Sequence, residues 1–68
     1  PNDVIFLGEV GLTGEIRSPV MFELRLKEIS QLKYNKIITS QKMAKSFQNK
    51  TKVELIGIEN IRELQTYL

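Results

Sequence analysis

Three short apolar runs alternate with segments of helical periodicity, and this alternation restricts the chain to few folds. The runs are Val4–Leu7, Ile37–Thr39 and Val53–Ile58. The first has no polar interruption, which is typical of a strand buried on both faces. Strands that alternate with helices indicate βαβ units. The sequence therefore predicts an α/β fold with a small, mostly parallel sheet, and an α+β fold is the alternative.

Glycines at intervals of three follow the first run. Gly8, Gly11 and Gly14 separate alternating polar and apolar residues up to Arg17. Because glycine adopts positive φ angles without steric cost, this pattern predicts strand interrupted by a turn or bulge. The spacing does not match a phosphate loop, since no Gly-Lys-Ser/Thr follows.

A helix is expected next, with Ser18 as its N-cap and Pro19 in its first position. Glu23 and Lys27 are four residues apart, which predicts a favourable ion pair. Leu24 lies off the apolar stripe and is a candidate contact for self-association. The stripe itself has four members: Phe22, Leu26, Ile29 and Leu32.

Two further helices are predicted by capping signals. Thr39 or Ser40 caps a short helix at Gln41–Phe47, and Asn60 begins the last helix. Glu63 follows Asn60 by three residues, the spacing of a capping box. The apolar stripe of the last helix is Ile61, Leu64 and Leu68. If all helices pack on one face of the sheet, the other face is bare, which predicts self-association or cover from a longer chain.

The composition leaves little room for catalysis. The 68 residues form one domain and contain no cysteine and no histidine, so a thiol nucleophile and a zinc site are excluded within this chain. A Ser–Lys dyad stays possible, but no such pair stands out. No apolar run approaches the ~20 residues of a membrane span, so a cytoplasmic location without a membrane partner is expected. We expect no enzyme activity, metal or cofactor in this chain.

The cations are unevenly distributed. Between Ile29 and Val53 there are six lysines and no acid, whereas all eight acids lie outside this segment. Such a stretch is a candidate phosphate-facing surface, and the alternative is an ordinary solvated face. The candidate DNA-binding residues are Lys33, Lys36, Lys42, Lys45, Lys50 and Lys52.

Several segments resemble one family of proteins. Val4–Arg17, with its Gly-Glu-Val-Gly-Leu-Thr-Gly-Glu-Ile-Arg, is similar to a signature stretch near the C-terminus of the RadA/Sms family of bacterial DNA repair proteins. Glu23–Glu28, Lys36–Ile38 and Ile56–Leu64 resemble the elements that follow it in that family. The chain departs from the family pattern at Lys33, Ser40 and Ser18–Met21. The resemblance covers essentially the whole chain.

The resemblance implies a Lon-protease-like (ribosomal S5 domain 2-like) fold, of which residues 1–68 form the C-terminal half. Glu23 stands where Lon has the lysine of its catalytic dyad, and a carboxylate cannot activate a serine as that lysine does. The resemblance therefore implies a non-catalytic scaffold or DNA-binding portion. The alternative is a fragment of a Lon-type ATP-dependent Ser–Lys peptidase.

For the longer protein, the same resemblance implies a cytoplasmic, DNA-dependent ATPase that uses ATP, Mg and Zn. It also implies a ring oligomer with DNA as partner, which processes branched DNA in recombination. None of these properties follows from the composition or the spacing of residues.

Overall fold

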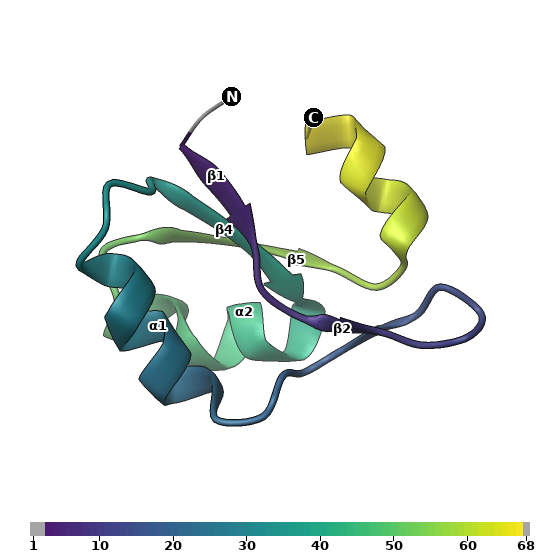
Figure 1. The fold of residues 1–68 in the computed structure, drawn as a ribbon, viewed down its shortest axis with the longest axis horizontal. Helices are drawn as coiled ribbons and strands as arrows, with labels where there is room; N and C mark the ends of the chain where they lie inside the picture. Colours follow the sequence, from purple (N-terminus) through teal and green to yellow (C-terminus); the bar gives the residue numbers. More distant parts are fainter. Residues whose placement is uncertain (1–2, 68) are drawn as a thin grey trace.

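The computed structural model describes residues 3–67 and is built around a three-stranded parallel sheet (Figure 1). Its strands are β1 (Val4–Phe6), β4 (Lys36–Ser40) and β5 (Glu54–Ile58), in the order β1-β4-β5. Both pairings are parallel. The predicted α/β class with a mostly parallel sheet is confirmed.

The strand buried on both faces is β4. Ile37, Ile38 and Thr39 have no exposed surface, because β4 lies between the other two strands and side chains cover both of its faces. The expectation of double burial for Val4–Leu7 is wrong. Among the described residues β1 is an edge strand with half-buried side chains, and only Leu7, just after it, is buried.

The glycine-punctuated segment forms an antiparallel hairpin of β2 (Glu9–Val10) and β3 (Ile16–Arg17). Gly14 has a φ of 90°, in the region that side chains disfavour. The predicted turn is therefore confirmed, with two short strands where the sequence indicated one. A hydrogen bond from Ile16 N–H to the Glu59 carbonyl (3.0 Å) joins the hairpin to the chain after β5.

The first helix, α1 (Phe22–Ser30), begins later than expected. Ser18 and Pro19 lie outside it, and its N-cap is Met21, in the left-handed region (φ 58°), without a side-chain cap. Ser18 Oγ instead lies 3.0 Å from Ser40 Oγ, so the Ser18 hydroxyl makes a tertiary hydrogen bond and does not cap α1. Of the predicted stripe, Phe22 and Leu26 are buried and Ile29 packs against the core, whereas Leu32 follows the helix and is exposed.

The second helix confirms its prediction closely. In α2 (Gln41–Phe47) the N-cap is Ser40, whose hydroxyl accepts a hydrogen bond from Met43 N–H (3.2 Å). A short 3-10 turn, η1 (Gln48–Lys50), follows. Helix α2 packs so closely on β5 that a Cβ at Gly57 would lie 2.8 Å from the Cα of Gln41. Glycine at this position therefore permits the contact between helix and strand.

The C-terminal helix, η2 (Ile61–Tyr67), is a 3-10 helix and not the expected α-helix. Its predicted capping box is present: Glu63 Oε2 accepts from Asn60 N–H (3.0 Å), and Asn60 Oδ1 accepts from Arg62 N–H (3.0 Å). Ile61 is half-buried. Leu68, the last member of the expected stripe, lies outside the described residues.

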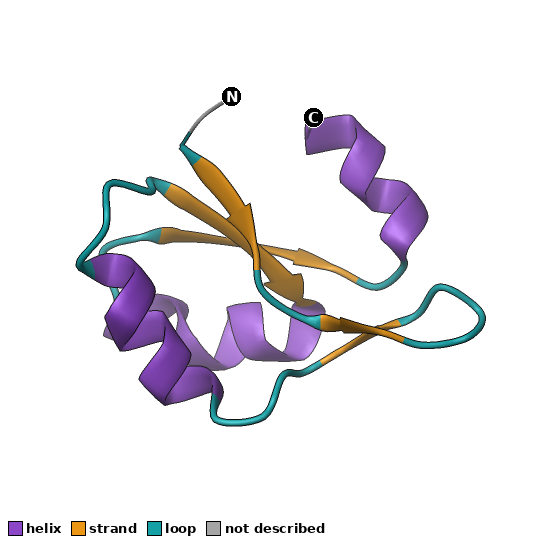
Figure 2. Cartoon of the chain, in the orientation of Figure 1, coloured by secondary structure: helices purple, strands orange, loops and turns teal. Residues whose placement is uncertain are grey.

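The helices lie on both sides of the sheet. Figure 2 shows α1 and α2 on one side of the strands and η2 on the other. Ile38 and Ile58 do not belong to the cluster that α1 and α2 cover, yet they are almost completely buried. The prediction of a bare face is therefore wrong. The core on the α1–α2 side consists of Leu7, Phe22, Leu26, Ile37, Ala44 and Leu55.

One carboxylate organises the hairpin. Glu15 Oε1 accepts a hydrogen bond from the Thr13 hydroxyl (2.6 Å), and Glu15 Oε2 accepts from Arg17 Nη2 (2.7 Å) and Nε (3.2 Å). The hydrogen bond from Thr13, followed by those from Arg17, lowers the pKa of Glu15 to about 2. The ionised carboxylate thus ties the turn to β3.

Replacing Thr39 by valine should stabilise the protein. Thr39 Oγ1 is completely buried and has no hydrogen-bond partner among the described residues. Valine keeps the shape and removes the desolvated hydroxyl, so we expect Thr39→Val to raise the free energy of unfolding by about 1 kcal/mol in urea titrations. Thr51→Val is the control: Thr51 Oγ1 accepts from Val53 N–H (3.2 Å), so this change should not stabilise. A destabilised Thr39→Val variant would contradict the conclusion that the Thr39 hydroxyl has no hydrogen-bond partner.

Acid should weaken the hairpin through Glu15. Because its folded pKa of about 2 lies below its ordinary value of 4.5, Glu15 stabilises the folded state fully above pH 4.5. This stabilisation is lost as the pH falls from 4.5 towards 2. Unfolding measured across this window should show a smaller loss for Glu15→Gln than for the unaltered chain. Glu9→Gln, on the facing strand, should keep the full loss; equal curves for both variants would refute the role of Glu15.

Candidate nucleic-acid interface

The fold divides the six candidate lysines between different places. Lys36 is the first residue of β4, Lys33 lies just before it, and Lys52 lies just before β5. Since β4 and β5 are parallel, these three side chains belong to the end of the sheet where the strands begin. Lys42 and Lys45 are on α2, and Lys42 lies near the opposite end of the sheet.

Acids from other parts of the chain reach this lysine-rich end. Glu54 is the register partner of Lys36 on β5. Asp3 Oδ2 accepts a hydrogen bond from Asn35 Nδ2 (3.0 Å), and this bond, with a smaller contribution from Lys36, lowers the pKa of Asp3. The surface around Lys36 therefore carries both signs of charge, although its sequence segment has only one.

Two lysines meet at a cavity between α1 and η1. The cavity has a volume of about 90 Å³, and its cationic and hydroxyl groups come from Lys27, Ser30, Lys50 and Thr51. We call these four residues the α1–η1 seam. Lys50 Nζ lies 5.1 Å from the centre of the Phe47 ring, a cation–π contact that positions Lys50 at the cavity.

Several hydrogen-bond donors of the seam have no acceptor among the described residues. Thr51 Oγ1 accepts from Val53 N–H, so its own proton is free to donate. Ser30 Oγ donates to the Lys27 carbonyl (2.8 Å). Among residues 3–67, neither Lys27 nor Lys50 forms an ion pair, so the expected Glu23–Lys27 pair is not present. Sequence reasoning missed Lys27 because its spacing from Glu23 indicated a paired lysine.

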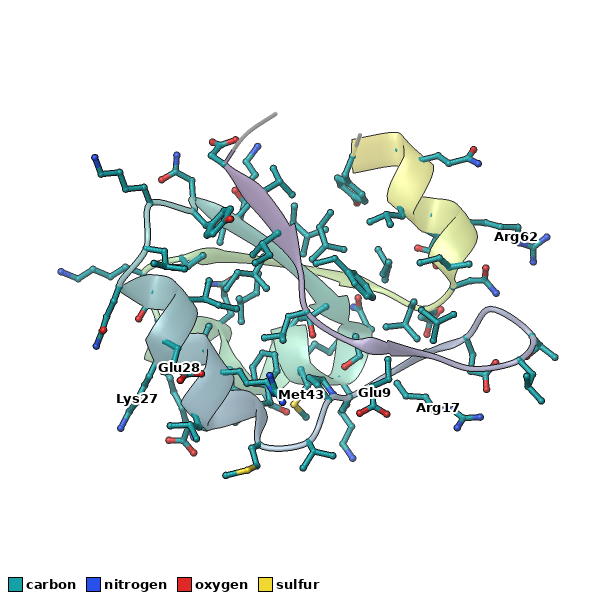
Figure 3. All side chains as sticks on the ribbon, in the orientation of Figure 1. Glu9, Arg17, Lys27, Glu28, Met43 and Arg62 are labelled. Carbon is teal, nitrogen blue, oxygen red and sulfur yellow. The ribbon has the colours of Figure 1, made fainter. Side chains whose placement is uncertain are left out.

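The arginines are engaged within the fold. Arg17 is bound by Glu15, Arg25 Nε donates to the Val20 carbonyl (3.2 Å), and Arg62 Nε donates to Asn60 Oδ1 (3.3 Å). Figure 3 shows Lys27 on α1, whereas Arg17 and Arg62 lie by the hairpin and η2. The lysines of the seam are therefore the more available cations for an external anion.

Two other predicted positions lie at the start of α1. Leu24 is half exposed and borders an open groove with Met21, Glu23 and Lys27. Glu23 lines both this groove and the seam cavity. Among residues 3–67, no three acidic side chains gather as metal ligands, and no helix is long and apolar enough to cross a membrane.

Comparisons with known proteins find relatives that are named DNA repair proteins. The chain is 35% identical over 65 residues, 96% of its length, to the DNA repair protein RadA of Rickettsia conorii. It is 36% identical over 58 residues, 85% of its length, to DNA repair protein RadA of Bacillus subtilis. The chain spans 14% and 13% of the lengths of these two relatives. No family model matches the sequence.

Proposed function

We propose that this chain is a DNA-contacting scaffold within a RadA-like DNA repair protein. The premise is that the chain is similar, over most of its length, to one segment of the RadA DNA repair proteins. The predicted resemblance to RadA is confirmed by 35% identity over 96% of the chain, and this identity is the observation that carries the proposal. The chain itself performs no chemistry in this proposal; the longer protein supplies it.

The proposal also includes an activity for the longer protein. A DNA-dependent ATPase that uses ATP and Mg, contains Zn, assembles as a ring and processes branched DNA is consistent with relatives named DNA repair proteins. The peptidase alternative has no supporting observation. By the resemblance, Glu23 stands at the position of the Lon dyad lysine. The hydrogen bonds of the Ser18, Ser30 and Ser40 hydroxyls do not involve the side-chain amine of any described lysine.

We assign the DNA contact to the α1–η1 seam. Phosphate oxygens accept hydrogen bonds and carry negative charge, so the two ammonium groups and the free hydroxyl proton beside one cavity suit them. The one carboxylate at this cavity, Glu23, forms no ion pair with either lysine among residues 3–67. Lys33 and Lys52 extend the positive charge beyond the seam. Lys36 contributes less because Glu54 and Asp3 lie beside it.

A scaffold role also requires surfaces for further protein. The outer edge of β1 has no partner strand among the described residues, and exposed edges favour the addition of another strand. We propose that preceding residues of a longer Lon-protease-like domain pair with it. The exposed Leu24 and Met21 then form a contact for self-association.

Removing two seam charges should weaken DNA binding. For the double variant Lys27→Gln with Lys50→Gln, we expect about tenfold lower affinity for a duplex at low salt, measured by fluorescence anisotropy. The slope of log K against log salt should fall by about 2, because two phosphate contacts are lost.

A charge-matched variant separates a site from a general effect of charge. Lys36→Gln with Lys45→Gln removes the same charge outside the seam and should weaken binding much less. Equal losses in the two double variants would mean that only net charge matters. Failure of the unaltered chain to bind duplex at low salt would refute the DNA contact.

A further inference from the structure

A second groove lies at the opposite end of the sheet, where β4 and β5 finish. It has a volume of about 400 Å³ and is formed by β3, the end of β5 and the junction of β4 with α2. Ligands of open parallel sheets commonly bind outside the carboxyl ends of strands. We call it the serine groove, after Ser18 and Ser40. Its other lining residues used below are Ile16, Arg17, Lys42, Ile58 and Glu59.

The two serine hydroxyls in the serine groove have two protons but only one hydrogen-bond acceptor between them among the described residues. Ser18 Oγ and Ser40 Oγ are 3.0 Å apart, so one of their two protons lies in the bond between them. Ser40 Oγ also accepts from Met43 N–H, which uses an acceptor site and no proton. Whichever serine donates, one hydroxyl proton is left without an acceptor among the described residues. Ser40 is 5% exposed and Ser18 is half-buried, so that proton belongs to a partly buried pair.

The side chains above the hydroxyls are mostly cationic. Arg17 and Lys42 both line the groove, and the single carboxylate among its lining residues is Glu59. Arg17 directs Nε and Nη2 to Glu15, which leaves Nη1 for another acceptor. No ion pair involves Lys42 among residues 3–67. The groove therefore offers an ammonium, part of a guanidinium and a spare hydroxyl proton, and its one carboxylate, Glu59, forms no ion pair with Lys42 or Arg17 among residues 3–67.

We propose that the serine groove binds a phosphate group. A phosphate carries several negatively charged acceptor oxygens, so it accepts the spare hydroxyl proton and pairs with Lys42 and Arg17 at once. Ile16 and Ile58 form the apolar part of the groove beside these polar groups. Of the four polar side chains, Ser40 and Lys42 come from the junction of β4 with α2, whereas Arg17 and Ser18 come from β3 and the segment that follows it. The proposal is independent of the proposed DNA contact, which lies at the other end of the sheet.

Titration of the full chain with inorganic phosphate tests this site. Amide resonances of Ser18 and of Ser40 to Met43 should shift in saturable fashion with sodium phosphate at constant ionic strength, and not with sodium chloride. Lys42→Gln should weaken phosphate binding about tenfold, because a charge-assisted hydrogen bond is lost. Lys45→Gln, which removes the same charge from the same helix outside the groove, should leave the affinity unchanged. Equal shifts with chloride, or equal losses in both variants, would overturn the proposal.

A second variant guards against loss of structure. Ser40→Ala would also remove the cap of α2, so Ser18→Ala is the better test of the hydroxyl pair. It should weaken phosphate binding severalfold while the far-ultraviolet circular dichroism spectrum stays unchanged. Unchanged affinity in Ser18→Ala would remove the serine pair from the site and overturn the proposal.

A further titration identifies the source of the phosphate. A short duplex that displaces phosphate and shifts the same amides assigns the groove to the DNA backbone. Phosphate binding without such displacement assigns it to a free phosphate or phosphate monoester. The Lys27→Gln with Lys50→Gln variant should bind phosphate normally, so failure of the α1–η1 seam and failure of the serine groove are distinguishable.

Discussion

The burial of β4 between two parallel strands is the constraint on which the structure depends. Ile37 and Ile38 point to opposite faces of the sheet, and neither has any exposed surface. One face of β4 is covered by α1 and α2, and η2 lies on the other side. Because parallel neighbours require crossover connections, this central strand also dictates that helices join β1 to β4 and β4 to β5.

The parallel arrangement gives the two ends of the sheet different chemistry. Lysines precede β4 and β5, so Lys33, Lys36 and Lys52 gather at one end. Ser40 ends β4 and meets Ser18 at the other end. Ser40 has three roles there, because it completes the strand, caps α2 and holds the loop before α1. The α1–η1 seam and the serine groove are therefore separate candidate sites for anions, with no residue in common.

Local signals in the sequence were sufficient where the interacting groups are close in the chain. The helix at Gln41–Phe47, its cap at one of two candidate residues, the Asn60–Glu63 capping box and a turn within the glycine-rich segment were predicted correctly. Each depends on hydrogen bonds or φ angles within a few residues. The same reasoning was wrong for Ser18. The Ser18-Pro19 sequence is typical of a helix start, but the Ser18 hydroxyl bonds to Ser40, 22 residues away, and does not cap α1.

The sequence by itself determined the α/β class, the relationship to RadA and the absence of thiol and imidazole chemistry, because periodicity, motif and composition are properties of the chain alone. Only the tertiary structure decided which strand is central, since burial depends on strand order and not on the length of an apolar run. It also decided which lysines act together. The fold brings Lys27 to Lys50, which is 23 positions further along the chain, and it brings Asp3 and Glu54 to Lys36, because contacts between elements bring together charges that are distant in the sequence.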